Sequence, residues 1–215
     1  MKTKMKITIL CSSKNHPVYS HLLRWIDENS PSHEISLIEK SDEIDSGDIL
    51  FLIACSEIIN EDLQNKFKKV LCVHESDLPE GKGWSPCVHY VLNGKNKIPL
   101  TLFEISKKID SGDIWKKTSF ELEGHELHDE INNLVSIHTI KLINFAIENF
   151  NSIQPTPQST TGESFFPRRF PSDSELDVNK TILEQFNLLR IADENRYPCF
   201  FIHNGHRYKI TIRKF

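Results

Sequence analysis

The sequence predicts an α/β protein with a Rossmann-like, doubly wound, mostly parallel sheet and a small C-terminal extension made of a helix and a β-hairpin. Short apolar runs alternate with amphipathic segments over residues 6–74, which is the pattern of βαβ units. The run ILFLIA at residues 49–54 has no polar residue and is typical of a central parallel strand covered on both faces. Near the C-terminus, Asn204-Gly205 separates two segments of strand pattern and is a strong hairpin signal.

The first half of the chain is expected to fold in the order strand, helix, strand, strand, helix, strand. Residues 6–11 form a short apolar strand pattern. Residues 17–29 place apolar side chains on one helical face, and Pro17 suits a first helical turn because its missing N–H costs nothing there. The remaining expected elements are a weaker strand at 34–38, a strand at 49–54, a helix at 61–67 and a strand at 70–74.

The pattern changes after residue 74. A polar loop at 75–84 precedes an expected helix at 85–92, with Ser85 as its N-cap. Two expected strands, 99–105 and 114–120, flank the turn that holds Asp110. The longest helical pattern of the chain covers residues 125–150, with its apolar residues on one face.

We expect residues 1–150 to form one domain, residues 151–165 a linker and residues 166–215 the small extension. The linker interpretation rests on a composition rich in Pro, Ser and Thr with few apolar residues. In the extension, the spacing of apolar residues predicts a helix at 179–190, followed by hairpin strands at 199–203 and 206–212.

The composition narrows the function classes. The chain has 215 residues, 38% of them hydrophobic, and a formal net charge of −4, so it can bury a core and is not a disordered tail or a fibre. A nucleic-acid partner is not expected, because nucleic-acid binding needs a basic surface.

The cysteine pattern and the shortness of the apolar runs indicate in which cellular compartment the protein is expected. The five cysteines are odd in number and contain no CxxC pair, which favours free thiols in a reducing cytosol. No metal site is expected, because His125 and His128 stand three residues apart and do not form an HExxH motif. Neither a signal peptide nor a membrane span is recognised, so we expect a cytoplasmic protein without a membrane partner.

His74 is the leading candidate for a reacting group. In open parallel sheets, ligands bind at the carboxyl ends of the strands, and His74 ends an apolar strand there and opens a polar loop. A packed histidine at a strand end is the alternative interpretation. The loop after the first strand, CSSKNHP, lacks GxGxxG and GxxxxGK[ST], so neither a dinucleotide site nor a P-loop is predicted.

The order of residues around His74 resembles the signature of the folate-dependent formyltransferases. HESDLP at 74–79, Gly83-x-x-Pro86, Asn93-Gly94 and DSGDI at 110–114 are similar to the family pattern HxSLLPxxxGxxP…GD…DxGDI. The segment that begins at Arg168-Arg169 resembles the C-terminal extension of the sugar N-formyltransferases, and the variants SDLPEGKGWSP and NKIPLTLFE resemble the branch that acts on amino sugars of the pseudaminic-acid type.

The resemblance implies a formyltransferase fold and transfer of a formyl group from N10-formyltetrahydrofolate to the amine of a nucleotide-linked amino sugar in glycan biosynthesis. Attack of an amine on a formyl carbon leaves a proton to remove and an oxyanion to stabilise. An imidazole suits both tasks, so His74 is expected to accept the proton or hydrogen-bond the oxyanion, with Asp110 orienting it. The resemblance leaves a homodimer open.

The sequence departs from the family two residues before His74, where Cys72 replaces the usual Asn. A thiol is a weak hydrogen-bond donor, so the oxyanion is expected to need other support, with Ser76 or a backbone N–H as candidates. Cys72 itself is interpreted as a small strand residue more readily than as a catalytic thiol.

The resemblance also places the ligand-binding segments. Backbone groups after the third strand and before Asp110 are expected to hold the pterin. The residues concerned are Cys55, Ser56, Glu57, Ile58, Glu104, Ile105 and Lys107. The candidate residues for the sugar nucleotide are Ser12, Ser13, Lys14, His16, Lys82, Trp84, Arg168 and Arg169, each of which an exposed loop position explains equally simply.

Two other functions stay open. A formyltetrahydrofolate hydrolase uses similar residues and lets water attack in place of an amine. A non-catalytic binder of folate or nucleotide sugars is favoured by the missing Asn at position 72. Transfer to methionyl-tRNA is disfavoured because the tail is short and the chain lacks the basic domain that tRNA would need, and transfer to glycinamide ribonucleotide because it would not need that tail.

Overall fold

The computed structural model describes residues 4–215 and contains a six-stranded sheet with the strand order β2-β1-β3-β4-β6-β7. Four neighbouring strands are parallel, and β6 and β7 continue the sheet in antiparallel orientation. The strands are β1 (Lys6–Leu10), β2 (Glu34–Ile38), β3 (Gly47–Leu52), β4 (Phe67–His74), β6 (Lys97–Glu104) and β7 (Ile114–Glu121). The predicted fold class is confirmed.

Both faces of the parallel strands are covered. Ile9 and Phe51 pack with the helices α1 (Val18–Asn29), α3 (Pro86–Leu92) and α4 (His128–Asn149) in the main core. Leu50 and Leu52 lie in a second cluster, covered by the segments around η1 (Ser41–Glu43) and α2 (Glu61–Gln64). Burial on both faces explains why these strands are continuous apolar runs and do not alternate with polar residues.

The two long helices pack against each other as well as against the sheet. The indole Nε1 of Trp25 in α1 donates to Oδ1 of Asn144 in α4 at 2.7 Å. On α4, residues of the face expected to be apolar are buried, among them Val135 and Ile143. No helix within residues 4–215 combines the length and the apolar character that a bilayer crossing requires.

Three local predictions were wrong. The helix expected at 61–67 is a single turn that ends at Gln64, because Phe67 pairs with Gly47 in the sheet. Ser85 precedes α3 with a φ of 46° and makes no side-chain capping bond. Of the helix expected at 179–190, only η3 (Leu183–Gln185) and α5 (Phe186–Arg190) form, since the side chains at 182 and 183 are exposed and no face packs there.

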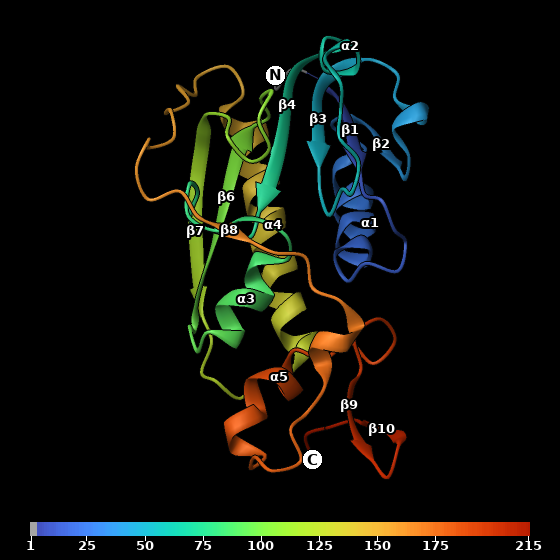
Figure 1. Cartoon of the computed structure of the whole chain (residues 1–215). Helices are drawn as coiled ribbons and strands as arrows, with labels where there is room; N and C mark the ends of the chain where they lie inside the picture. The colour runs from blue at the N-terminus through green and yellow to red at the C-terminus, as the bar shows by residue number, and fades with distance from the viewer. Residues whose placement is uncertain (1–3) are drawn as a thin grey trace.

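The predicted hairpin near the C-terminus is confirmed. Strands β9 (Cys199–His203) and β10 (His206–Ile210) pair antiparallel, and Asn204 and Gly205 both have the positive φ that a tight hairpin turn requires. Figure 1 shows α5, β9 and β10 at the end of the molecule opposite the N-terminus, beyond the end of α4 at which His128 lies.

The segment at residues 156–167, which we call the strap, returns from α4 across the end of β4 (Figure 1). It begins with a two-bond bridge between Thr156 and Ile114, with N···O distances of 2.8 and 2.9 Å. It then forms β8 (Phe165–Phe166), which pairs in parallel with β5 (Lys82–Gly83) in the loop that the sequence analysis expected to be irregular. The remaining 3₁₀ turn of the fold, η2 (Pro171–Ser174), follows the strap.

Candidate active site

The structure brings His74 and Asp110 together. His74 is the last residue of β4, and its Nε2 lies 3.7 Å from Oδ2 of Asp110 and 3.0 Å from the carbonyl oxygen of Gly81. The two side chains are 11% and 14% exposed, so they are partly open to solvent and are not enclosed in packed hydrocarbon. Because a carbonyl oxygen only accepts, Nε2 carries the hydrogen, and Nδ1 is the basic nitrogen of the neutral ring.

Asp110 is held by backbone contacts on two sides. It has a φ of 50°, and its Oδ2 accepts from the N–H of Gly83 at 2.9 Å. The side-chain Nε2 of Gln158 donates to the carbonyl oxygens of Asp110 and Gly112, at 3.0 and 2.8 Å. These contacts fix the turn that carries the carboxylate, although Gln158 lies 48 residues further along the chain.

Cys72 lies two residues before His74 in β4 and therefore faces the same side of the sheet. Burial raises the pKa of the Cys72 thiol, and the carboxylate of Asp110 and the thiol of Cys55 raise it further. The thiol is therefore neutral at physiological pH, which favours the interpretation of Cys72 as a packed strand residue. The hydroxyl of Ser76 is buried and has no hydrogen-bond partner within residues 4–215.

The expected pterin segment after β3 lies beside the loop after β1. The N–H of Ser56 donates to the hydroxyl of Ser12 at 3.0 Å, and the Cys55 thiol contacts the carbonyl oxygen of Glu57 at 3.5 Å. The carboxylate of Glu57 accepts from the backbone N–H of Ser41 in η1. The side chain of Ile58 is 83% exposed.

The expected pterin segment before Asp110 is tied to the sheet and to α2. The carboxylate of Glu104 accepts from Nζ of Lys69 at 2.6 Å and from Nε1 of Trp115 at 2.8 Å. Ile105 packs against the second core cluster. Nζ of Lys107 pairs with Glu61 at 2.8 Å and so links the segment to the start of α2.

The residues of the loop after β1 point in different directions. The hydroxyl of Ser13 accepts from the N–H of Asn15, and Nζ of Lys14 pairs with Glu39 at 2.8 Å. Burial lowers the pKa of His16 to about 4, with the nearby charges of Arg196 and His128 adding to the effect. His16 therefore faces the C-terminal segment and stays neutral.

The remaining candidates divide into buried and exposed residues. Nζ of Lys82 is occupied by two protein oxygens and its side chain is only 4% exposed, so this ammonium is not offered to a phosphate. Trp84 is 48% exposed, and the guanidinium of Arg168 lies 4.9 Å from its ring centre. Arg169 instead donates to the carbonyl oxygen of Asp173 and lies over the ring of Tyr197.

Sequence reasoning missed the strap. Gln158, Glu163 and Ser164 all contact the loop or the turn of the site, yet they stand in a stretch without hydrophobic periodicity. The only signal was the polar, proline-containing composition that indicated a linker. Within residues 4–215, no group of three or more His, Cys, Asp or Glu side chains is arranged to hold a metal ion.

Comparison with known proteins gives the same fold. The 4-N formyltransferase from Francisella tularensis superposes with a TM-score of 0.71 at 19% identity, covering 98% of this chain and 99% of that protein. Methionyl-tRNA formyltransferase from Clostridium thermocellum gives a TM-score of 0.78 at 18% identity, with coverages of 98% and 93%. The chain has the formyltransferase fold. HypX from Aquifex aeolicus in complex with tetrahydrofolic acid gives a TM-score of 0.78 at 18% identity, with coverages of 98% and 38%.

Curated relatives by sequence are also formyltransferases, although no family model matches the chain. Methionyl-tRNA formyltransferase of Streptococcus agalactiae serotype III is 24% identical over 195 residues, which is 86% of this chain and 61% of the relative. The enzyme of Bacillus subtilis is 27% identical over 171 residues, with coverages of 78% and 53%. The chain thus spans between half and two thirds of these relatives. The formyltransferase resemblance seen in the sequence is confirmed by these comparisons.

Proposed function

We propose that this chain transfers a formyl group from N10-formyltetrahydrofolate to the amine of a nucleotide-linked amino sugar. The observation that carries the proposal is the approach of the His74 imidazole to the Asp110 carboxylate at 3.7 Å, at the carboxyl end of a parallel strand in a formyltransferase fold. An imidazole beside a fixed carboxylate is suited to take a proton at near-neutral pH.

The bonds and the proton of the proposed formyl transfer can be accounted for with the groups at this site. The amine nitrogen of the acceptor bonds to the formyl carbon, the bond from that carbon to N10 breaks, and N10 gains the proton that the amine loses. His74 can take that proton at Nδ1, or its Nε2–H can turn from Gly81 to the developing oxyanion. Loss of one such oxyanion donor typically slows a reaction by about 10²–10³. Asp110, whose Oδ2 lies 3.7 Å from Nε2, orients the ring.

The two loops expected to hold the folate carry exposed apolar side chains that can contact the face of a flat ring. Ile58 on the first loop and Ile109 on the second are 83% and 64% exposed, and the ion pair between Lys107 and Glu61 joins the two segments. Apolar side chains that face solvent beside backbone donors suit a ring with polar edges. When bound, the folate supplies the formyl group, and the chain provides its position and the proton acceptor.

Exposed aromatic and cationic groups near the loop support a nucleotide-bearing acceptor. Arg168 lies between the rings of Trp84 and Phe170, at 4.9 and 5.9 Å from their centres. Trp84 follows Gly83, the residue that binds Asp110, so the aromatic surface begins one residue from the site. A base can stack on such a ring, and a guanidinium is suited to a phosphate.

Mass spectrometry tests the proposal. The chain is incubated with N10-formyltetrahydrofolate and a panel of UDP- and TDP-linked amino sugars, with methionyl-tRNA as a competing acceptor. We expect one sugar to gain the mass of a formyl group while methionyl-tRNA does not. Formylation of the tRNA, which the curated relatives catalyse by name, would overturn the choice of acceptor. Formate release without an acceptor would instead identify a hydrolase.

Variants of the two central residues test the mechanism. His74→Ala and Asp110→Asn are expected to lower kcat at least about 100-fold, because proton transfer by a positioned side chain typically contributes about 10²–10⁴. Folate affinity, measured by fluorescence, should change little in both. Retained transfer by His74→Ala in a folded protein would contradict the assigned role.

A further inference from the structure

Lys82 stands between the two backbone groups that touch the proposed catalytic pair. Its neighbour Gly81 offers the carbonyl oxygen that accepts from His74 at 3.0 Å. Its other neighbour, Gly83, offers the N–H that donates to Asp110 at 2.9 Å. The peptide groups on the two sides of Lys82 therefore set where both functional side chains rest.

The ammonium of Lys82 is buried and joins three segments. Nζ lies 2.6 Å from the hydroxyl of Ser111, beside Asp110, and 2.6 Å from Oε1 of Glu163 in the strap. The Lys82 side chain is 4% exposed, whereas that of Glu163 is 50% exposed. Burying an ammonium is unfavourable unless hydrogen bonds of this kind replace its lost hydration. A role in fixing the geometry explains why the charge stands there.

The strap fixes the same loop through its main chain. The N–H of Gly81 donates to the hydroxyl of Ser164 at 2.9 Å, and the N–H of Lys82 donates to the carbonyl oxygen of Ser164 at the same distance. A Cβ at residue 83 would lie 2.6 Å from the carbonyl oxygen of Phe166, so the loop can approach the strap only as glycine. Loop and strap are therefore in direct main-chain contact.

We propose that Lys82, clamped by Glu163 of the strap, is a positioning residue that sets the contact between His74 and Asp110 through Gly81 and Gly83. This inference rests on the proposed function. It assigns Lys82 a role different from the phosphate contact that its place in a strand-end loop suggests, because a phosphate would have to displace both Ser111 and Glu163.

The test compares Lys82→Met, Lys82→Arg and Glu163→Gln with a matched control, Lys68→Met. Lys68 also pairs with a carboxylate, that of Asp48, but it lies near the start of β4, away from the site. The first readout is kcat and KM for formyl transfer per folded molecule. We expect Lys82→Met to lower kcat about 10- to 100-fold with KM within about threefold, because displacing reacting groups by about 1 Å can cost about 10²-fold. Lys82→Arg should recover part of the loss, and Lys68→Met should match the parent chain.

The second readout does not depend on activity. The nitrogen chemical shifts of the His74 ring report its bond to Gly81, and we expect them to move in Lys82→Met and not in Lys68→Met. The double variant Lys82→Met/Glu163→Gln should have a kcat close to that of Lys82→Met alone, because the two changes remove the same contact. Unchanged His74 shifts in a folded Lys82→Met would overturn the inference. If the His74 shifts change in Lys82→Met but the parent chain formylates no acceptor, the positioning role of Lys82 is supported and the proposed function is rejected.

Discussion

At the scale of single residues, the turn that carries Asp110 depends on a glycine. A Cβ at residue 112 would lie 1.6 Å from the carbonyl oxygen of Glu104, far closer than two unbonded heavy atoms can approach. The N–H of Glu104 also donates to the carbonyl oxygen of Asp113 at 2.9 Å, so the end of β6 and the turn are already in contact. The glycine in the DxGD pattern is thus required by close approach of two backbones.

Gly112→Ala should therefore damage both stability and activity. We expect the free energy of unfolding to fall by about 2 kcal/mol or more, the scale of an overpacked site, and formyl transfer to fall with it as Asp110 shifts. Gly94→Ala is the control, because its Cβ would meet no atom within 4 Å and only the φ of 73° is strained, at about 1 kcal/mol. Equal losses in the two variants, measured by urea unfolding, would contradict this reasoning.

Some residues of the candidate site could be singled out from the sequence, and others could not. His74 and Asp110 could be singled out because an imidazole at a strand end and a carboxylate in a turn have recognisable chemistry and spacing. The burial of Lys82 could not be predicted, because a lysine in a polar loop is usually exposed, and only the folded structure shows that its side chain is 4% exposed beside Glu163 of the strap. Gln158 gave no signal, since its partners are backbone carbonyl oxygens that any residue could supply.

At the scale of elements, the junction of β4 with α3 contains a carboxylate beside the proposed catalytic histidine. Burial raises the pKa of Glu75 to about 7, and a hydrogen bond from the backbone N–H of Cys87, near the start of α3, offsets part of that rise. The folded chain thus holds a proton at this carboxyl more tightly than the unfolded chain does.

The consequence is a stability that falls as pH rises. Between pH 4.5, the ordinary pKa of the carboxyl, and about pH 7, its folded value, the folded state binds more protons than the unfolded state. The contribution of Glu75 is complete below that window and is lost through it, by about 3 kcal/mol at the usual conversion from pKa to free energy. Glu75→Gln should therefore stabilise the chain relative to the parent at pH 8 and not at pH 4.5. The free energy of unfolding is measured with urea at several pH values. Glu80→Gln is the control, because Glu80 is exposed, and its pH dependence should match that of the parent. The same pH dependence in Glu75→Gln would refute the raised pKa of Glu75.

Strands and helices were predictable where burial of their faces gives the sequence a hydrophobic pattern. Strands β1 and β3 are apolar on both faces because both faces are packed, so their runs stood out in the sequence. The helix expected at 179–190 was wrong because apolar residues there, such as Ile182 and Leu183, are exposed, and spacing alone cannot show whether a partner surface exists. The strap left no periodic apolar pattern, because polar and main-chain contacts hold much of it and Phe166 near its end packs against the core.

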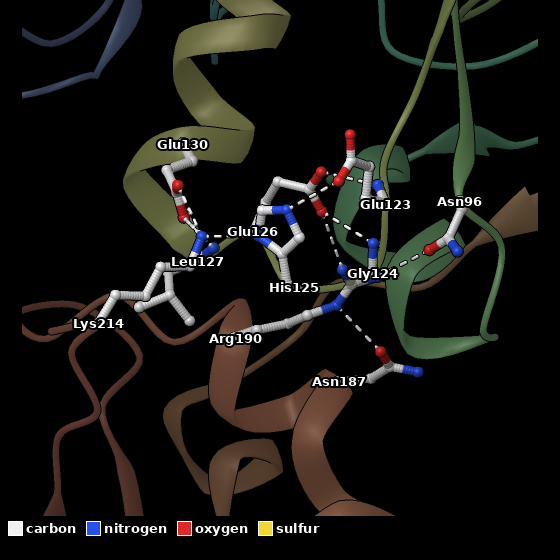
Figure 2. Close-up of polar contacts among 10 residues, drawn as sticks. All are labelled: Asn96, Glu123, Gly124, His125, Glu126, Leu127, Glu130, Asn187, Arg190 and Lys214. Atoms are coloured by element: carbon white, nitrogen blue, oxygen red, sulfur yellow. Dashed lines mark hydrogen bonds and ion pairs between the residues drawn. The ribbon is translucent and has the colours of Figure 1, made fainter.

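At the scale of the whole molecule, one buried charge joins the C-terminal segment to the rest. Figure 2 shows Arg190 of α5 reaching the loop before α4, where NH1 lies 3.5 Å from the Glu126 carboxylate. Its NH2 donates to Asn96, after α3, at 3.1 Å, and the Arg190 side chain is 1% exposed. The adjacent Ile191 belongs to the main core cluster. The segment therefore shares its core with the sheet and should unfold together with it.

Arg190→Met should test how strongly that junction couples the molecule. Removing one partner of a buried pair leaves the Glu126 carboxylate without its countercharge, which typically costs about 3–5 kcal/mol. Lys214→Met is the matched control, because Lys214 pairs with Glu130 in the same region (Figure 2) but the two side chains are 40% and 47% exposed, where such pairs contribute less than about 1 kcal/mol. Calorimetry should show one transition in the parent chain and a much lower Tm in Arg190→Met. A Tm as high as that of Lys214→Met would mean that the charge does not hold the C-terminal segment in place, and two transitions in the parent would mean that the segment folds separately from the sheet.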